Sequence, residues 1–192
     1  MKNKTFYRIK DKFKHIGISW DELAPGKDNA IEFAHTHINP EPQRMIDTNH
    51  YTMEYCLAHS GESVNERFRQ NRADNIDLQI AEMVASHTTD TDLVLYRGVC
   101  DYVYDLMKKN AKNLPDCDLY EKGFLATSLV KGHELNYEIK LRIYVPAGTK
   151  CVYQGNVNAE QDSYEVDVMH SSKLKIISID NEYINCKLIA TA

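Results

Sequence analysis

The spacing of hydrophobic residues changes near the middle of the chain. Up to about residue 112 apolar residues recur three and four positions apart, as in amphipathic helices, and later they form the alternating or continuous runs typical of strands. The helices predicted in this way cover residues 1–20, 47–58, 63–69, 75–86 and 101–112. The predicted strands cover residues 93–99, 125–127, 137–145, 151–153, 165–169, 174–179 and 184–189.

This order of elements predicts the fold class. Helices followed by strands favour an α+β domain with an antiparallel sheet over a doubly wound parallel sheet. In the strand at 137–145, apolar residues alternate with Glu138, Lys140, Arg142 and Tyr144, which we therefore expect on the solvent side.

The length of the chain predicts one compact domain. Its 192 residues, 43% of them hydrophobic, are enough to fill a single core. Within this domain we distinguish an N-terminal basic helix with loops, residues 1–42, from a main unit, residues 43–192. The first 14 residues are strongly basic. A solvated arm or helix face is the favoured interpretation, ahead of a docking arm for an acidic partner.

Composition and charge argue against several classes of function. The sequence has no run of about 18 apolar residues, so we expect no membrane-spanning helix, and residues 1–19 lack the apolar core of a secretory signal. The five cysteines are odd in number and lack metal-finger spacing, which favours reduced thiols in a cytoplasmic protein. The net charge of −5 argues against sequence-independent binding of nucleic acid.

A pair of histidines has two interpretations. His35 and His37, separated by Thr36, would lie on one side of a strand, as two metal ligands can. The local sequence supplies no third ligand. A surface or packed pair is therefore favoured, and we expect no metal site.

Two charged residues lie within apolar strands. Arg97 precedes Gly98, and a buried guanidinium needs an anion such as a carboxylate or a diphosphate. Glu165 shares one strand face with Ser163 and Asp167. Taken singly, Arg97 favours a structural ion pair and Glu165 an exposed strand residue.

Together, five short motifs follow one another in the order and spacing of a known family. They are Val64-Asn65-Glu66-Arg67-Phe68-Arg69, Tyr96-Arg97-Gly98-Val99, Gly123-Phe124-Leu125-Ala126-Thr127-Ser128-Leu129, Tyr164-Glu165-Val166 and Lys173-Leu174-Lys175-Ile176. Over residues 45–180 the chain resembles the arginine–serine–glutamate class of mono-ADP-ribosyltransferases, the relatives of clostridial binary-toxin and Rho-modifying exoenzymes. The resemblance implies a two-sheet NAD-binding core and a catalytic unit over residues 43–192.

The resemblance also implies roles for individual residues. Glu165 would be the catalytic glutamate that bonds the nicotinamide ribose and stabilises an oxocarbenium-like transition state. Arg97 would act with it and hold the NAD diphosphate, and Gly98 would offer backbone contacts to the nicotinamide amide. The other residues implied in NAD binding are Asn65, Arg69, Thr127 and Ser128.

Two positions depart from the family pattern. Ala126 stands where the family has a serine that orients the glutamate, and Ser163 stands at the catalytic position that engages the acceptor, usually Glu or Gln. Glu160 and Gln161 are close enough in sequence to substitute for it. The expected activity is transfer of ADP-ribose from NAD to a macromolecule, with a protein favoured over a nucleic acid, in the cytoplasm of a producing or recipient cell, as for an effector, toxin or phage-borne modifier. The alternatives are an NAD glycohydrolase and a catalytically impaired NAD-binding or protein-binding module.

Overall fold

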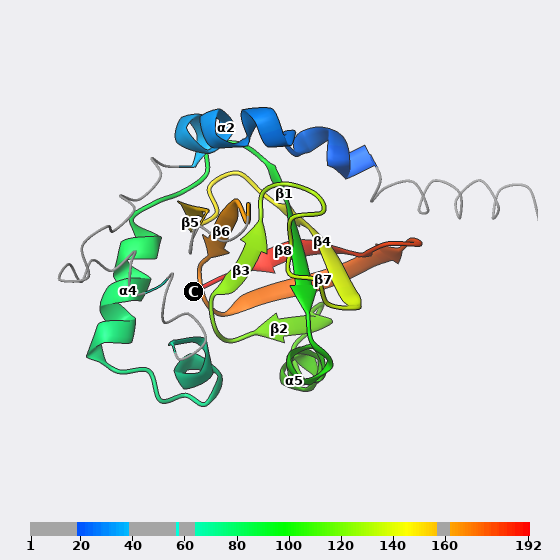
Figure 1. Ribbon diagram of the computed structural model, residues 1–192. Helices are drawn as coiled ribbons and strands as arrows, with labels where there is room; N and C mark the ends of the chain where they lie inside the picture. The colour runs from blue at the N-terminus through cyan, green and yellow to red at the C-terminus, as the bar shows by residue number, and fades with distance from the viewer. Residues whose placement is uncertain (1–18, 39–56, 58–63, 157–161) are drawn as a thin grey trace, which may run out of the picture.

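A computed structural model of the chain describes residues 19–38, 57, 64–156 and 162–192 (Figure 1). The helical elements are η1 (Asp21–Leu23), η2 (Lys27–Asn29), α2 (Ala30–His37), a helical segment at 64–69, α4 (Asn75–Ala85) and α5 (Asp101–Ala111). The strands are β1 (Leu93–Val99), β2 (Leu119–Glu121), β3 (Leu125–Ser128), β4 (Ile139–Val145), β5 (Cys151–Gly155), β6 (Glu165–Val168), β7 (Ser172–Ile179) and β8 (Ile184–Ala190).

The helices confirm the predicted pattern where the structure describes it. Helices α4 and α5 each end one residue before the predicted end. A capping box begins α4, because the Asp74 carboxylate accepts bonds from the backbone of Ile76 and Asp77. Nearly all of the predicted helices 1–20 and 47–58 lies outside the described residues.

The described strands form one hydrogen-bonded sheet in the order β2-β7-β8-β4-β1-β3-β6-β5. The α+β class with a mostly antiparallel sheet is confirmed, but β4 and β8 pair in parallel. Strands β1 and β3 share a single registered pair, Tyr96 with Ser128. Hydrogen bonds therefore join both halves of the sheet, and its expected division into two sheets is not confirmed.

Three local predictions were wrong. Residues 30–37 form helix α2, so His35 and His37 do not alternate on a strand. Strand β2 was not expected, since three residues carry too little periodicity to detect. Arg142 is fully buried instead of solvent-facing, because carboxylates from two other segments surround it.

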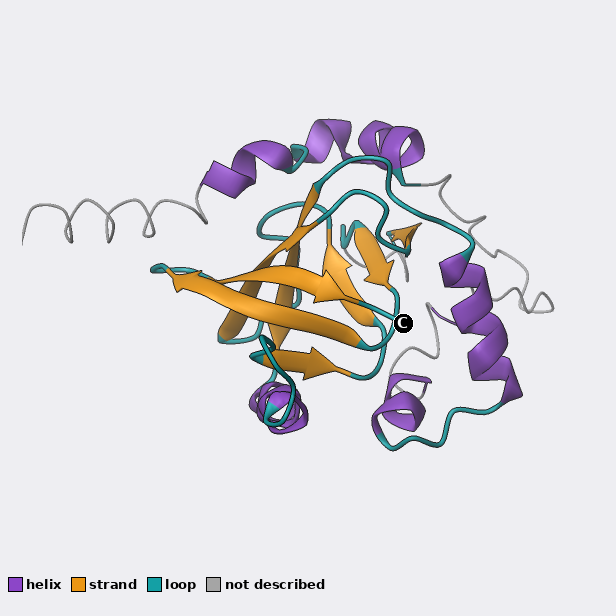
Figure 2. Ribbon diagram, turned by 180° about the vertical axis from the view of Figure 1, so that it is seen from behind, coloured by secondary structure: helices purple, strands orange, loops and turns teal. Residues whose placement is uncertain are grey.

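Helices surround the sheet, as both views show (Figures 1 and 2). Helix α5 packs against β2, and α4 contacts β5. The largest hydrophobic cluster includes Leu93 and Leu95 of β1 and Val166 of β6. A second cluster holds the helical half against the sheet, with Phe68 packed edge-on to Phe124 at 5.4 Å between ring centroids. Among the described residues no helix is long and apolar enough to cross a membrane, and no group of side chains could hold a metal ion.

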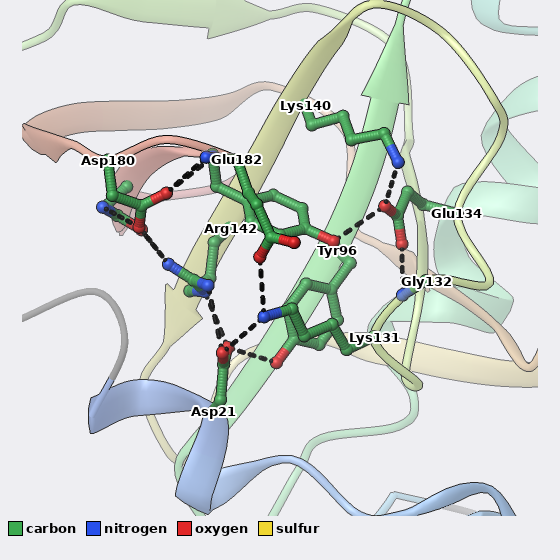
Figure 3. Close-up of polar contacts among 11 residues, drawn as sticks. Asp21, Tyr96, Lys131, Gly132, Glu134, Lys140, Arg142, Asp180 and Glu182 are labelled. Atoms are coloured by element: carbon green, nitrogen blue, oxygen red, sulfur yellow. Dashed lines mark hydrogen bonds and ion pairs between the residues drawn. The ribbon is translucent and has the colours of Figure 1, made fainter.

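A polar network attaches the N-terminal segment to the sheet (Figure 3). Asp21 of η1 lies 2.7 Å from Arg142 Nε and accepts hydrogen bonds from the Tyr96 hydroxyl at 2.7 Å and from Lys131 Nζ at 2.9 Å. On its other side the Arg142 guanidinium donates to Asp180 at 2.5 Å and to Asn185 at 2.7 Å. The buried guanidinium therefore has an anion on each side.

Candidate functional site

Arg97 lies on β1, within the sheet, and is 8% exposed. Its Nη1 donates to the carbonyl oxygen of Ala126 at 2.9 Å, and its Nη2 donates to Glu121 at 3.3 Å. The Nε atom is buried and has no hydrogen-bond partner among the described residues. Burial lowers the pKa of Arg97, although the charge of Glu121 opposes this effect. An anion that approached Nε would relieve that cost.

Glu121, at the end of β2, joins two arginines. Its carboxylate accepts bonds from Arg69 Nε at 3.0 Å and Nη2 at 2.8 Å, in addition to the bond from Arg97. The backbone of Gly123 donates to it at 2.9 Å. Burial acts to raise the pKa of Glu121, but the two arginines outweigh it and the pKa is lowered. Glu121 is therefore an ionised bridge that places Arg69 beside Arg97.

Asn65 supports the turn that leads into β3. Its Oδ1 accepts a hydrogen bond from the backbone of Phe124 at 2.7 Å. A Cβ atom added to Gly123 would lie 2.7 Å from the same oxygen, so the turn requires glycine there. The Asn65 side chain is thus engaged by the fold.

The hydroxyl groups at the end of β3 also bond to the backbone. Thr127 Oγ1 donates to the carbonyl oxygen of Val166 at 2.6 Å and links β3 to β6. Ser128 Oγ donates to the carbonyl oxygen of Val130 at 3.0 Å and accepts a bond from its N–H at 3.2 Å. Both hydroxyls stabilise strand and turn geometry around the site.

Gly98 lets a loop lie directly against β1. A Cβ atom on Gly98 would lie 1.7 Å from the carbonyl oxygen of Leu135 and 3.3 Å from the backbone nitrogen of Tyr137. The glycine is therefore needed for contact with the chain's own loop. The same loop reaches the approach to β6, where His133 Nδ1 lies 2.6 Å from the carbonyl oxygen of Asp162 and its ring packs edge-on to Tyr164.

Glu165 begins β6 and lies beside a second carboxyl group. Tyr164 precedes it with φ 45°, a left-handed backbone conformation that turns the chain into the strand. Burial raises the pKa of Glu165 to about 7, against the hydrogen bond with Asp167 and the charge of Arg97, both of which lower it. Asp167 is 2% exposed, and burial together with the charge of Glu165 raises its pKa well above the usual range.

Gln154 of β5 completes this polar group. Its amide nitrogen and oxygen are both buried without hydrogen-bond partners among the described residues, although the amide is near enough to Asp167 to lower that pKa. The position falls at an irregularity where the β5–β6 register shifts between Tyr153 and Gly155. A bulge of this kind changes the direction in which the side chains of the strand point.

Of the predicted site residues, Arg97 and Glu165 interact electrostatically, and Arg69 joins Arg97 through Glu121. Ser163 Oγ donates to the carbonyl oxygen of Gly155 at 3.2 Å. Glu160 and Gln161 lie outside the described residues.

Sequence reasoning missed the roles of Glu121 and Gln154. An acid just before Gly123-Phe124 was the available signal for Glu121. No sequence signal marked Gln154, since its place depends on a register shift between strands.

Comparison with solved structures supports the fold. The chain is similar to C3larvin toxin, an ADP-ribosyltransferase from Paenibacillus larvae, with a TM-score of 0.58 and 15% identity over 87% of this chain and 96% of that one. C3stau2 from S. aureus, solved with NAD, gives a TM-score of 0.56 and 17% identity over 94% and 95% of the two chains. The Clostridium limosum C3 exoenzyme gives 0.55 and 18% over 74% and 87%. At such identities these likenesses show the fold alone.

Sequence comparison gives the family. No curated protein sequence matches the chain significantly. The family model for ADP-ribosyltransferase exoenzymes matches residues 43–192, which is most of the chain and includes Arg97, Glu121 and Glu165. The chain belongs to the ADP-ribosyltransferase exoenzyme family.

Proposed function

We propose that the chain is a mono-ADP-ribosyltransferase that uses NAD to modify a protein acceptor. The observation that carries the proposal is the buried guanidinium of Arg97, whose positive charge acts on Glu165 where β1 adjoins β3 and β6. One side of this pair offers an unpartnered guanidinium N–H, and the other offers a carboxyl group at the start of a strand. A dinucleotide with an anionic diphosphate and a ribose hydroxyl is complementary to both.

Arg97 supports the diphosphate end of this proposal. Its Nε has no partner among the described residues, and its Nη2 contact with Glu121 is long at 3.3 Å. A diphosphate oxygen could therefore add a charge-assisted hydrogen bond without displacing the shorter bond to Ala126. Arg69 would stay on Glu121 and contribute positive charge to the same region.

Glu165 supports the part of the proposal that concerns the reaction at the nicotinamide ribose. In its ionised form a fixed carboxylate stabilises positive charge that develops on the ribose as the glycosidic bond to nicotinamide breaks. It also accepts a hydrogen bond from a ribose hydroxyl, which fixes the orientation of the sugar. With a pKa of about 7, roughly half of Glu165 is ionised at neutral pH.

A second function, NAD glycohydrolysis, is favoured by Ser163. The hydroxyl of Ser163 bonds to the carbonyl oxygen of Gly155, so this side chain offers no carboxylate or amide to an acceptor. Water would then accept the ADP-ribose. We propose the cytosol, where NAD is available, as the place of either reaction.

The test is an assay of nicotinamide release and of label transfer from NAD into a cell lysate, with mass spectrometry of the labelled proteins. We expect a discrete labelled protein and its loss in Glu165→Gln, because the amide cannot supply the negative charge. The matched control is Glu138→Gln, at an exposed position before β4. Nicotinamide release without a labelled protein would favour glycohydrolysis. Equal turnover by wild type and Glu165→Gln would reject both functions.

A further inference from the structure

Asp167 is a buried carboxyl group for which the proposed function supplies no role. It is 2% exposed and lies two residues after Glu165 on β6, so both side chains are on one face of the strand. Its Oδ2 atom is buried without a hydrogen-bond partner among the described residues. An ionised carboxylate in this place would cost several kcal/mol, so the neutral acid is favoured.

The groups around Asp167 include one anionic partner for its proton. In the sheet register Asp167 lies opposite Ala126 of β3 and Val152 of β5, and neither side chain has a polar atom. The titratable and charged groups that act on it are Glu165 and Arg97, and the Gln154 amide is the remaining polar neighbour. Of these, only Glu165 can accept a hydrogen bond as an anion.

The difference in burial between the two acids decides which one holds the proton. Asp167 is almost completely enclosed, whereas Glu165 is partly exposed. Desolvation penalises the charged form more where burial is deeper, so when the pair loses one proton the charge resides on Glu165. The pKa of Asp167 is raised in accordance with this order.

We propose that Asp167 is a positioning residue, whose protonated carboxyl donates a hydrogen bond to Glu165 and fixes the carboxylate for reaction. The inference rests on the proposed function of Glu165. The facing residue on β3, Ala126, has only a methyl group and cannot donate such a bond. Ser128, which the register places opposite Glu165, donates its hydroxyl proton to the carbonyl oxygen of Val130 instead. A donor to Glu165 is therefore needed on β6 itself.

The experiment compares Asp167→Leu, Asp167→Asn and Asp167→Leu with Ala126→Ser, using nicotinamide release with water as acceptor. Asp167→Leu should lower kcat by about tenfold or more and change KM for NAD by less than about threefold, because one orienting hydrogen bond is lost. Asp167→Asn keeps an N–H donor and should retain several times the kcat of the leucine variant. Its kcat should follow a single ionisation with pH, since the amide shares no proton with Glu165.

Two comparisons separate positioning from damage to the fold. Leucine replaces an unpartnered buried acid by an apolar side chain of similar shape, so the Tm of Asp167→Leu should equal or exceed that of the wild type. Adding Ala126→Ser places a hydroxyl opposite residue 167 and should restore most of the lost kcat. The matched control, Asp105→Leu on exposed α5, should leave kcat and its pH profile unchanged. A kcat of Asp167→Leu within twofold of the wild type overturns the inference.

A measurement without turnover tests the inference if the proposed function fails. The pKa of Glu165 can be followed by carbon NMR of its labelled carboxyl group in the wild type and in Asp167→Leu. Loss of a donor should raise this pKa by one unit or more. A pKa that falls shows that Asp167 was a charged neighbour, and an unchanged pKa shows that the two groups are not bonded; either result rejects the inference.

Discussion

At the scale of single residues, burial acts on the two principal charges of the site in different directions. It lowers the pKa of Arg97, which stays charged because an arginine pKa begins far above neutrality, and it raises the pKa of Glu165 to about 7. Of these charged groups, the carboxyl pair of Glu165 and Asp167 is therefore the one that gains or loses a proton near neutral pH. The pH dependence of turnover should report this pair.

The first prediction concerns that pH dependence. If Glu165 acts as proposed, its carboxylate is the active form, so kcat for nicotinamide release should fall about tenfold per pH unit below pH 7. It should fall again at the higher pH at which Asp167 loses its proton. The measurement is kcat at saturating NAD between pH 5.5 and 9, with circular dichroism at each pH to confirm folding. A constant kcat between pH 5.5 and 7 contradicts the ionisation of Glu165 at neutral pH.

Sequence reasoning singled out Arg97 and Glu165 as candidate site residues because each lies in a short motif with a fixed neighbour. It could not find the bridge made by Glu121, since Arg69 and Arg97 reach that carboxylate from segments 52 and 24 residues away. It placed Asp167 on the Glu165 face through strand alternation. Whether Asp167 was buried depended on partner strands that alternation does not identify.

At the scale of elements, the contact between β1 and the loop before β4 decides the shape of one side of the site. The backbone of Leu135 occupies the space that a side chain on residue 98 would fill. This contact joins a strand that carries Arg97 to a loop whose His133 packs against Tyr164, just before Glu165.

The second prediction tests this contact with alanine. Gly98→Ala should destabilise the fold by about 1–3 kcal/mol, because the new methyl group requires the loop backbone to move. Chemical unfolding measures the loss, and faster amide exchange in residues 131–138 locates it. Gly26→Ala is the matched control: a Cβ there meets nothing within 4 Å, and its φ of −71° suits alanine. Equal effects of the two substitutions would show that the contact is unimportant.

Elements were predictable to the extent that their own side chains encode them. Helix α4 shows an apolar stripe, so its existence followed from sequence, and it ends one residue before the predicted end. Strand β2 is too short to show a period, and the parallel pairing of β4 with β8 depends on topology. Alternation in β4 correctly buried Leu141 and Ile143 but failed at Arg142, whose partners come from η1 and from the turn before β8.

At the scale of the whole molecule, Arg142 connects the two ends of the described chain. It bonds Asp21, before the family-matched region, and Asp180, between the last two strands (Figure 3). Burial would raise the pKa of Asp180, but bonds from the backbone of Glu182 and Tyr183, from Asn185 and from Arg142 lower it to about 2. The sheet is therefore stabilised by ionised acids at neutral pH.

The third prediction follows from this network. Arg142→Met should lower the free energy of unfolding at pH 7 by about 3 kcal/mol, since it removes the buried cation that Asp21 and Asp180 share. Asp180 titrates near 2 when folded and near 3.8 when unfolded, so its contribution is present above pH 4 and is lost as the pH falls toward 2. The difference between wild type and variant should shrink over that range. Urea unfolding measures it, and Arg72→Met, at an exposed arginine, is the control. Equal stability of both variants at pH 7 would reject the network as a stabilising element.

The hydrogen bond from the Phe124 backbone to Asn65 affects how mutants of this protein should be interpreted. Asn65 belongs to the residues that the family resemblance assigns to NAD binding. Its side-chain oxygen, however, accepts a hydrogen bond that stabilises the turn from Gly123 into β3. A screen scored by activity alone would report its loss as a binding defect. Measuring protein abundance as well as activity separates a folding defect from a binding defect. Substitution of a residue engaged by the fold lowers both abundance and activity, whereas substitution of a residue that only contacts NAD lowers the activity per folded molecule.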